Sequence, residues 1–313
     1  MKTILYFLLT LSILTSCTKE YYERGGSSKN VTDAVNHKTK VVLLGTGTPN
    51  ADPERSGPSV AIIVGNQAYL VDCGPGLVRR ASAAFKKGIA ALKVEKLNKL
   101  FITHLHSDHT AGLSDLILSP WVLGRDVPLQ VIGPSGTKNM ADNVLSAYRE
   151  DINNRLSGLE PANKNGYKVN VTEYKEGLIY QDSNVNVYAY KVEHGNWKES
   201  YALQFVSSDR VITISGDCKP CEGILAASMG CDILVHEVYS YVGFLTRKPE
   251  WQKYHKSSHT STVELSELAI KVKPKTLVLY HILSWGASPL SMLNEIKQQY
   301  KGTVYCGNDL EVY

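Results

Sequence analysis

A short segment that follows an apolar stretch gathers three histidines and one aspartate within six positions. The residues are His104, His106, Asp108 and His109, and the apolar stretch before them is 100–102. In an extended segment His104 and His106 project to the same side and can share one metal ion, whereas a turn lets Asp108 and His109 face a second ion nearby. The spacing therefore predicts a site for two metal ions.

One loop cannot complete two such sites, because each ion needs about four ligands with one position left open for water or substrate. Three further candidates stand at the ends of apolar, strand-like runs: His194, Asp217 and His281. Side chains at strand ends are held on a rigid support. Any one of them alone has a simpler explanation, since a polar residue often closes a strand. The prediction that they bind metal therefore rests on their order along the chain and on their sequence contexts.

In this order the candidates resemble the ligand motifs of the metallo-β-lactamase superfamily of metallohydrolases. Two further family-like segments occur early in the chain, at Leu43–Pro49 and Asp72–Gly76. The resemblance spans nearly the whole chain after its first 40 residues, and it implies an α/β fold, the four-layer αβ/βα sandwich, with the metal site at one edge between two sheets. It also implies two ligand sets, one made of His104, His106, His194 and Asp217, the other of Asp108, His109, Asp217 and His281.

Within the superfamily the pattern is most similar to ribonuclease Z and its relatives, which include arylsulfatases and cyclic-nucleotide phosphodiesterases. The segments that carry it are 215–222, the pair His236-Glu237, and 258–262. This resemblance implies that His259 donates a proton to the leaving oxygen and that Glu237 holds its tautomer. His259 can equally be a neighbour of a helix cap, because Thr260 and Ser261 begin the next predicted helix.

Two activities of the superfamily are disfavoured. True β-lactamases of this fold usually carry a cysteine at the position of Asp217, and the adjacent Cys218 would point to the opposite face of a strand. The tRNA-processing enzymes carry a long arm between the third and fourth ligand motifs. Here roughly two dozen residues separate His194 from Asp217, enough for a strand hairpin.

The expected chemistry follows from two zinc ions bridged by Asp217 and by solvent, since this arrangement lowers the pKa of the solvent and supplies a hydroxide nucleophile. Asp108 can also orient the hydroxide and accept its proton. Zinc is expected from the ligand types, although manganese, iron or cobalt also suit His and Asp ligands. The first hypothesis is a phosphodiesterase or arylsulfatase that acts on a small anionic ester. The alternatives are a lactonase or thioesterase-type hydrolase, or a catalytically idle metal-binding envelope lipoprotein.

The amino terminus predicts export. Lys2 precedes the apolar stretch Ile4–Leu14, which is too short to span a bilayer and fits the core of an export signal. The sequence Leu-Thr-Ser-Cys that ends at Cys17 resembles the processing site of bacterial lipoproteins. We therefore expect a signal peptide at 1–16, a lipidated Cys17 with a flexible tether at 17–39, and one hydrolase domain at 40–313. The enzyme would be lipid-anchored in the bacterial cell envelope, in the periplasm or on the outer surface, and would touch the membrane through Cys17 only.

Composition restricts the partners. The formal net charge is +4, and no concentrated stripe of Lys and Arg indicates a nucleic-acid track. Relatives are frequently dimers, so a homodimer is a candidate state. Five cysteines follow Cys17, and no disulfide pairing is predicted among Cys73, Cys218, Cys221, Cys231 and Cys306.

Two segments leave their roles open. The insertion 239–256 carries Tyr241, Phe244, Trp251 and Tyr254, and it forms either a wall over the site or a surface loop that packs its own aromatic residues. Arg55 either pairs with an anionic group or closes a surface turn.

Hydrophobic periodicity and turn residues outline the supporting elements. Helices are predicted at 77–87, 112–118, 137–148, 222–229, 262–272 and 289–300, and 151–166 is predicted to be a loop. Strands are predicted at 41–45, 60–64, 67–72, 129–132, 168–172, 185–192, 201–206, 211–215 and 233–236.

Overall fold

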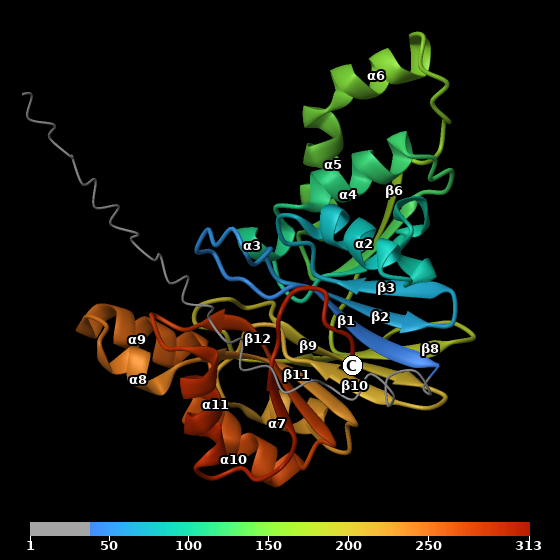
Figure 1. Cartoon of the computed structure of the whole chain (residues 1–313). Helices are drawn as coiled ribbons and strands as arrows, with labels where there is room; N and C mark the ends of the chain where they lie inside the picture. Colours follow the sequence, from blue (N-terminus) through green and yellow to red (C-terminus); the bar gives the residue numbers. More distant parts are fainter. Residues whose placement is uncertain (1–37) are drawn as a thin grey trace, which may run out of the picture. The chain divides into compact units, whose positions relative to one another are not determined.

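Two β-sheets form the centre of the computed structural model, which describes residues 38–313 (Figure 1). The first sheet has six strands in the order in which they occur along the chain, with β1 to β3 antiparallel and β3 to β6 parallel. Its strands are β1 (Thr39–Gly45), β2 (Ser59–Val64), β3 (Gln67–Val71), β4 (Lys99–Phe101), β5 (Leu129–Gly133) and β6 (Val169–Glu173).

The second sheet has seven strands in the order β13-β12-β11-β10-β9-β8-β7. Strands β7 to β10 are antiparallel neighbours, and β10 to β13 are parallel. The strands are β7 (Gly177–Gln181), β8 (Val185–Lys191), β9 (Tyr201–Ser207), β10 (Val211–Ile214), β11 (Ile233–Tyr239), β12 (Thr276–Leu283) and β13 (Val304–Cys306).

The alternation of side chains along each strand explains the layers. Val41 and Leu43 of β1 face a core between the sheets, whereas Val42 and Leu44 face a second core on the outer side. Because nearly all of β1, β2 and β3 is buried on both faces, these strands are mostly apolar. In the central core, Phe101 of the first sheet meets Phe205 of the second edge to face at 5.3 Å between ring centroids.

Helices cover the outer face of each sheet, which completes four layers (Figure 1). The predicted αβ/βα sandwich is therefore confirmed. On the first sheet lie α2 (Leu77–Lys86), the 3-10 turns η1 (Ala90–Leu92) and η2 (Val94–Lys96), α4 (Leu113–Val122) and α5 (Thr137–Ala147). On the second sheet lie α7 (Glu222–Ser228), α10 (Thr262–Val272) and α11 (Pro289–Lys297).

One predicted loop is wrong over part of its length, because residues Arg149–Ser157 form helix α6. The segment is polar and rich in asparagine, which hides its helical tendency. Arg155 pairs with Asp151 at 3.0 Å, one helical turn earlier, and also with Glu160 beyond the helix. Ile152 is buried on the inner side of α6. Pairs at this spacing support a short helix that one apolar contact alone would not hold.

The insertion between β11 and α10 contains two helices, α8 (Tyr241–Leu245) and α9 (Pro249–Ser258).

Within residues 38–313, no helix combines the length and apolar character needed to cross a membrane. The predicted signal peptide and lipidated Cys17 lie in residues 1–37, outside the described part of the chain.

Candidate metal centre

The His-rich segment leaves the end of β4 and turns at once into the short helix α3 (Ser107–Thr110). His104 and His106 precede the helix, and His106 has the extended dihedral angles of an N-cap residue. Asp108 and His109 lie inside the helix and are buried. The change from extended chain to helix therefore separates the two pairs of side chains, as the spacing predicts.

Two groups of donor atoms result, each compact enough to hold a metal ion. The first donor group consists of His104, His106, His194 and Asp217, and the second of Asp108, His109 and His281. In each group the donor atoms lie within 4.8 Å of one another. All seven predicted metal-ligand candidates are thus brought together.

In the first donor group the three histidine nitrogens are close neighbours. The Nδ1 atom of His106 lies 3.0 Å from Nε2 of His104 and 3.1 Å from Nε2 of His194. Asp217 Oδ2 lies 3.9 Å from Nε2 of both His104 and His194. His106 therefore faces the group with Nδ1, whereas the other two histidines face it with Nε2.

The second donor group shares Asp217 with the first. Its His281 Nε2 lies 3.2 Å from Asp108 Oδ2 and 3.4 Å from Asp217 Oδ2. His109 Nε2 lies 3.6 Å from Asp108 Oδ2 and 3.4 Å from Asp217 Oδ1. The carboxylate of Asp217 thus stands between the two groups with one oxygen turned toward His109 and the other toward the remaining histidines.

Four buried polar atoms at the centre lack a hydrogen-bond partner within residues 38–313: Nε2 of His109, Oδ1 of Asp217, Nδ1 of His281 and Oε2 of Glu237. An unsatisfied buried polar atom costs about 1–3 kcal/mol, so native proteins seldom keep one without a purpose. Imidazole nitrogens and carboxylate oxygens are ligands of divalent transition metals. The donor set therefore fits metal ions.

The local electrostatics keep the first donor group in the protonation state that binds metal. Burial lowers the pKa of both His106 and His194 to about 4, and lowers the pKa of His104 well below its usual value. Although burial opposes it, the neighbouring His281 and His109 hold the pKa of Asp217 well below its usual value. At neutral pH three imidazoles therefore offer lone pairs beside an ionised carboxylate.

Asp217 reaches the centre through a tight bend after β10. Gly216 in this bend has a φ of 59°, and a Cβ atom there would lie 2.8 Å from the backbone oxygen of Tyr201 and 3.0 Å from the Thr103 side chain. Only glycine combines this dihedral angle with so close an approach. Gly216 therefore allows Asp217 to lie against the loop that carries His104.

His281 owes its position to a β-bulge in β12. Glu237 of β11 pairs with Tyr280 and Val238 pairs with Ile282, so His281 is an extra residue, with a φ of 43°. Simple alternation would place it on the helix-covered face with Leu277 and Leu279. The bulge removes it from the alternation and turns it toward the donor groups.

His259 and Glu237 also lie at the centre. His259 Nδ1 is 3.2 Å from Glu237 Oε1, and this oxygen accepts hydrogen bonds from the backbone N–H groups of Cys218 and Thr260. His259 also lies within ligand distance of Asp217 and His281. The helix cap itself is Ser261, which forms a capping box with Glu264. His259 is therefore placed as an acid or as an additional ligand, and the second option was missed at the level of sequence.

Comparison with known proteins agrees with this arrangement. The family described as "Anti-Pycsar protein Apyc1" matches residues 39–284. The chain belongs to this family.

Similarity extends to proteins named ribonuclease Z. The one from Mycobacterium marinum is 31% identical over 284 residues and covers 87% of this chain and 96% of its own. That of Mycobacterium sp. (strain KMS) is 35% identical over 248 residues and covers 78% of this chain and 84% of its own. These relatives span most of the described residues.

Solved structures show the same fold. The metallo-β-lactamase fold protein YhfI from Bacillus subtilis has a TM-score of 0.66 at 16% identity and covers 88% of this chain and 98% of its own. Human tRNase Z, short form, has a TM-score of 0.64 at 22% identity with the same coverage, 88% and 98%. A diphosphatase of the PhnP family has a TM-score of 0.59 at 18% identity, with 88% and 97% covered. The chain therefore has the metallo-β-lactamase fold.

A second carboxylate, Asp72, supports the second donor group and was not recognised from the sequence. It follows β3, accepts a hydrogen bond from the backbone N–H of Thr103 at 2.8 Å, and lies 2.8 Å from His109 Nδ1. Metal-bound histidines commonly donate their other N–H to such a carboxylate. A signal was present, because Asp72 ends the strand beside β4, whose end begins the His-rich loop.

Arg55 joins two segments that are distant in the sequence, a contact that differs from both of its proposed roles. Its guanidinium donates to Thr46 Oγ1 at 2.6 Å, to the Gly307 carbonyl at 2.9 Å and to Asn308 Oδ1 at 3.0 Å. It therefore ties the loop after β1 to the chain that follows β13.

In the described residues the five cysteines are free, and Cys218 is fully buried in the core of the second sheet.

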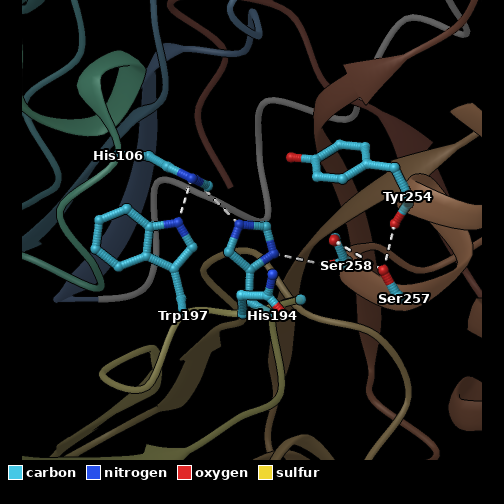
Figure 2. A pocket seen from close by; sticks show the side chains of 8 residues that line it. His106, His194, Trp197, Tyr254, Ser257 and Ser258 are labelled. Carbon is cyan, nitrogen blue, oxygen red and sulfur yellow. Dashed lines mark hydrogen bonds between the residues drawn. The ribbon is translucent and has the colours of Figure 1, made fainter.

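One pocket opens beside the first donor group (Figure 2). Its volume is about 170 Å³, and its walls include His106, His194, Trp197, Tyr254, Ser257 and Ser258. Tyr254 and the serines come from α9, so the insertion does form a wall next to the centre. Trp197 was not singled out from the sequence, because nothing local indicates that its turn faces α9.

Proposed function

We propose that this protein is a metal-dependent hydrolase that cleaves a phosphodiester bond in a small anionic ester. The observation that carries the proposal is the position of Asp217 between two compact donor groups that together contain five histidines and one further aspartate. Such a shared carboxylate suits a pair of metal ions about 3.5–4 Å apart. The ligands would be His104, His106, His194 and Asp217 for one ion, and Asp108, His109, Asp217 and His281 for the other.

A bound metal pair would lower the pKa of water so that a hydroxide nucleophile exists at neutral pH, and would polarise the ester. Zinc suits the donor set best, and manganese, iron and cobalt remain chemically compatible with it. The family relationship and the relatives named ribonuclease Z support phosphorus as the centre under attack.

The chain's own residues would then handle the protons. Asp108, whose Oδ2 lies near His109 and His281 in the second donor group, would also orient the attacking water and accept its proton. His259 would donate a proton to the leaving oxygen, with Glu237 holding the N–H on Nδ1. Burial lowers the pKa of His259 to about 4 in the free protein, and the negative charge of a bound ester would favour its protonated form.

A small substrate is supported by the connection between β8 and the bend at Asp217. Residues 195–216 form a turn, strands β9 and β10 and the loop between them. The compact hairpin supports the earlier expectation that precursor tRNA is not the substrate. The pocket beside the first donor group has a volume of about 170 Å³, which also suits a small substrate.

The cellular location remains the one that the amino terminus predicts. We propose that the protein is exported and lipid-anchored through Cys17. Metabolic labelling with a radioactive fatty acid would test this. Label on the wild-type protein that is lost in Cys17→Ser supports the anchor. A wild-type protein that carries no label and does not fractionate with the cell envelope contradicts it.

The activity is tested by measuring the metal content of the purified protein and then its turnover of four substrates. These are bis-p-nitrophenyl phosphate, a cyclic nucleotide, p-nitrophenyl sulfate and a lactone. Two metal ions per chain with hydrolysis of the phosphodiesters is the expected result. Preferential cleavage of the sulfate would identify an arylsulfatase, and preferential cleavage of the lactone a carboxyl-ester enzyme. Metal without turnover would indicate a binding protein.

Two variants distinguish a loss of metal binding at the site from a general effect on folding. Asp217→Asn should lose metal and turnover, because it removes the charge shared by both donor groups. Asp142→Asn is the matched control, since Asp142 is exposed on α5 and, within residues 38–313, its ion-pair partner is Lys138 at 2.7 Å. Equal turnover in both variants would contradict the proposal.

A further inference from the structure

We propose that Trp197 and Tyr254 form an aromatic recess that holds a planar ring of the substrate, so that ring-bearing esters are preferred over ring-free ones. The inference rests on the proposed function and adds to it the chemical class of the group beside the reacting ester. It is carried by the pocket of about 170 Å³ that shares two side chains, His106 and His194, with the first donor group.

Trp197 is held rigidly at one side of this recess. Its backbone N–H donates to the His194 carbonyl at 3.0 Å, which closes a tight turn directly after the metal-ligand candidate. The indole meets the His106 ring edge to face, with 4.6 Å between the ring centroids and an interplanar angle of 83°. Even so, 38% of Trp197 is exposed. A large aromatic face is therefore fixed next to the centre without being used for the core.

Tyr254 stands on the opposite side of His194 in the close view (Figure 2). It belongs to α9, its ring centroid lies 5.9 Å from that of His259, and 41% of the residue is exposed. Helix α9 is fastened to the turn of Trp197 at two points. The Gly195 N–H donates to the Ser257 carbonyl at 3.0 Å, and His194 Nδ1 lies 2.7 Å from the Ser258 carbonyl.

Gly195 makes this approach possible. It has a φ of 53°, and a Cβ atom there would lie 2.6 Å from Ser258 Oγ. The two aromatic side chains thus come from distant parts of the sequence, but their spacing is set by direct backbone contacts. A recess with fixed walls suits a rigid planar group, because neither partner loses much conformational freedom on binding.

The lining of the recess excludes the charged part of the substrate. The described residues around it are histidine, glycine, asparagine, tryptophan, tyrosine and serine, without a lysine, arginine or carboxylate. An anionic phosphoryl group would bind at the metal centre, while an uncharged ring stacks in the recess. Asn196 and Ser257 can hydrogen-bond to polar atoms on its edge.

Two phosphonates that are not hydrolysed provide the test. Phenylphosphonate and methylphosphonate carry the same anionic group at a pH where both are fully ionised, and they differ only in the ring. Their dissociation constants for the metal-loaded full-length protein are measured by titration calorimetry. Because stacking of a ring on an aromatic side chain contributes about 1–3 kcal/mol, we expect phenylphosphonate to bind at least about fivefold more tightly.

The preference should depend on both aromatic residues. Trp197→Ala and Tyr254→Ala should each reduce the ratio of the two dissociation constants severalfold, and Trp197→Phe should preserve most of it. Tyr241→Ala is the matched control, since Tyr241 is an exposed aromatic residue of the same insertion that does not line the pocket. The ratio is compared within each variant, so a general loss of metal or of affinity cancels.

Three outcomes would overturn the recess: a ratio near one in the wild type, a ratio unchanged in both alanine variants, or no binding of phenylphosphonate. These outcomes are distinct from failure of the proposed function. If phosphodiesters are hydrolysed but the ratio of the two dissociation constants is the same in Trp197→Ala and Tyr254→Ala as in the wild type, only the recess is wrong. If the ratio behaves as expected but no phosphodiester is cleaved, the recess stands and the reaction is misassigned.

Discussion

Asp72 Oδ2 lies 2.8 Å from His109 Nδ1, and the Asp72 carboxylate also accepts the backbone N–H of Thr103 at 2.8 Å. One buried side chain therefore orients a metal-ligand candidate and holds the loop from which that candidate comes. Asp72 itself has a φ of 57°, a dihedral angle that a residue other than glycine adopts only when its surroundings enforce it.

The first prediction concerns this carboxylate. Asp72→Asn should weaken metal binding at the second donor group by about 10–100-fold, because it removes the charge that orients His109, while the first donor group keeps its affinity. Competitive titration with a chromogenic chelator would measure the two affinities. Asp142→Asn, which removes an exposed partner of Lys138 at 2.7 Å on α5, serves as the control. Equal loss at both groups would refute a selective role.

The second prediction concerns His259. His259→Ala should reduce turnover by about 10²–10⁴-fold for phosphodiesters whose leaving alcohol is a weak acid, since such groups need a proton donor. Hydrolysis of bis-p-nitrophenyl phosphate, which has a good leaving group, should fall much less and is the internal control. The metal content of the variant decides between the two placements of His259. Retention of both ions supports the acid, and loss of one ion shows that His259 is a ligand.

The third prediction concerns the acid stability of the metal-free protein. His236 is fully buried, and burial lowers its pKa to about 4, below the value of about 6.5 expected in the unfolded chain. Between these values the unfolded state binds a proton that the folded state does not. His236 alone should therefore lower the stability by roughly 3 kcal/mol as the pH decreases from about 6.5 to about 4. Urea unfolding in the presence of a chelator would measure this.

The same experiment on His236→Gln should give a shallower dependence on pH, because the substituted side chain does not titrate. A slope that is identical in the wild type and the variant would show that His236 contributes nothing to it. His255, His106, His194 and His259, whose pKa values burial also lowers to about 4, would account for the slope that remains.

The fourth prediction concerns Arg125, which is 1% exposed and donates to backbone carbonyls only. Its guanidinium binds the carbonyls of Leu97, Leu116, Ile117 and Gly166. Arg125→Met should lower the free energy of unfolding by about 3 kcal/mol or more, because several buried acceptors lose their donor. The exposed Arg79→Met should change it little. Thermal unfolding of both variants would compare them, and equal melting temperatures would contradict the prediction.

The metal-ligand candidates could be predicted because their information is local. His104, His106, Asp108 and His109 share one short segment, and His194, Asp217 and His281 each follow an apolar run. The sandwich could be predicted for a similar reason, since strands buried on both faces leave long apolar stretches. These signals do not require knowledge of which strand lies beside which.

The remaining features depend on long-range contacts. Asp72 becomes significant only once β3 and β4 are known to be neighbours, and Trp197 only once its turn is known to meet α9. Helix α6 was predicted as a loop because its polar residues give no apolar period, and ion pairs such as Arg155 with Asp151 stabilise it instead.

The extra residue at His281 makes the enzyme sensitive to the length of one strand as well as to its composition. Deletion of a single residue between Leu277 and Tyr280 would let β12 regain uninterrupted pairing with β11, with His281 then opposite Glu237 and facing as Tyr280 does now. A homologue could therefore keep every histidine and aspartate of the site and still lose a bound metal ion, because deletion of one residue elsewhere in β12 turns His281 away from the donor groups.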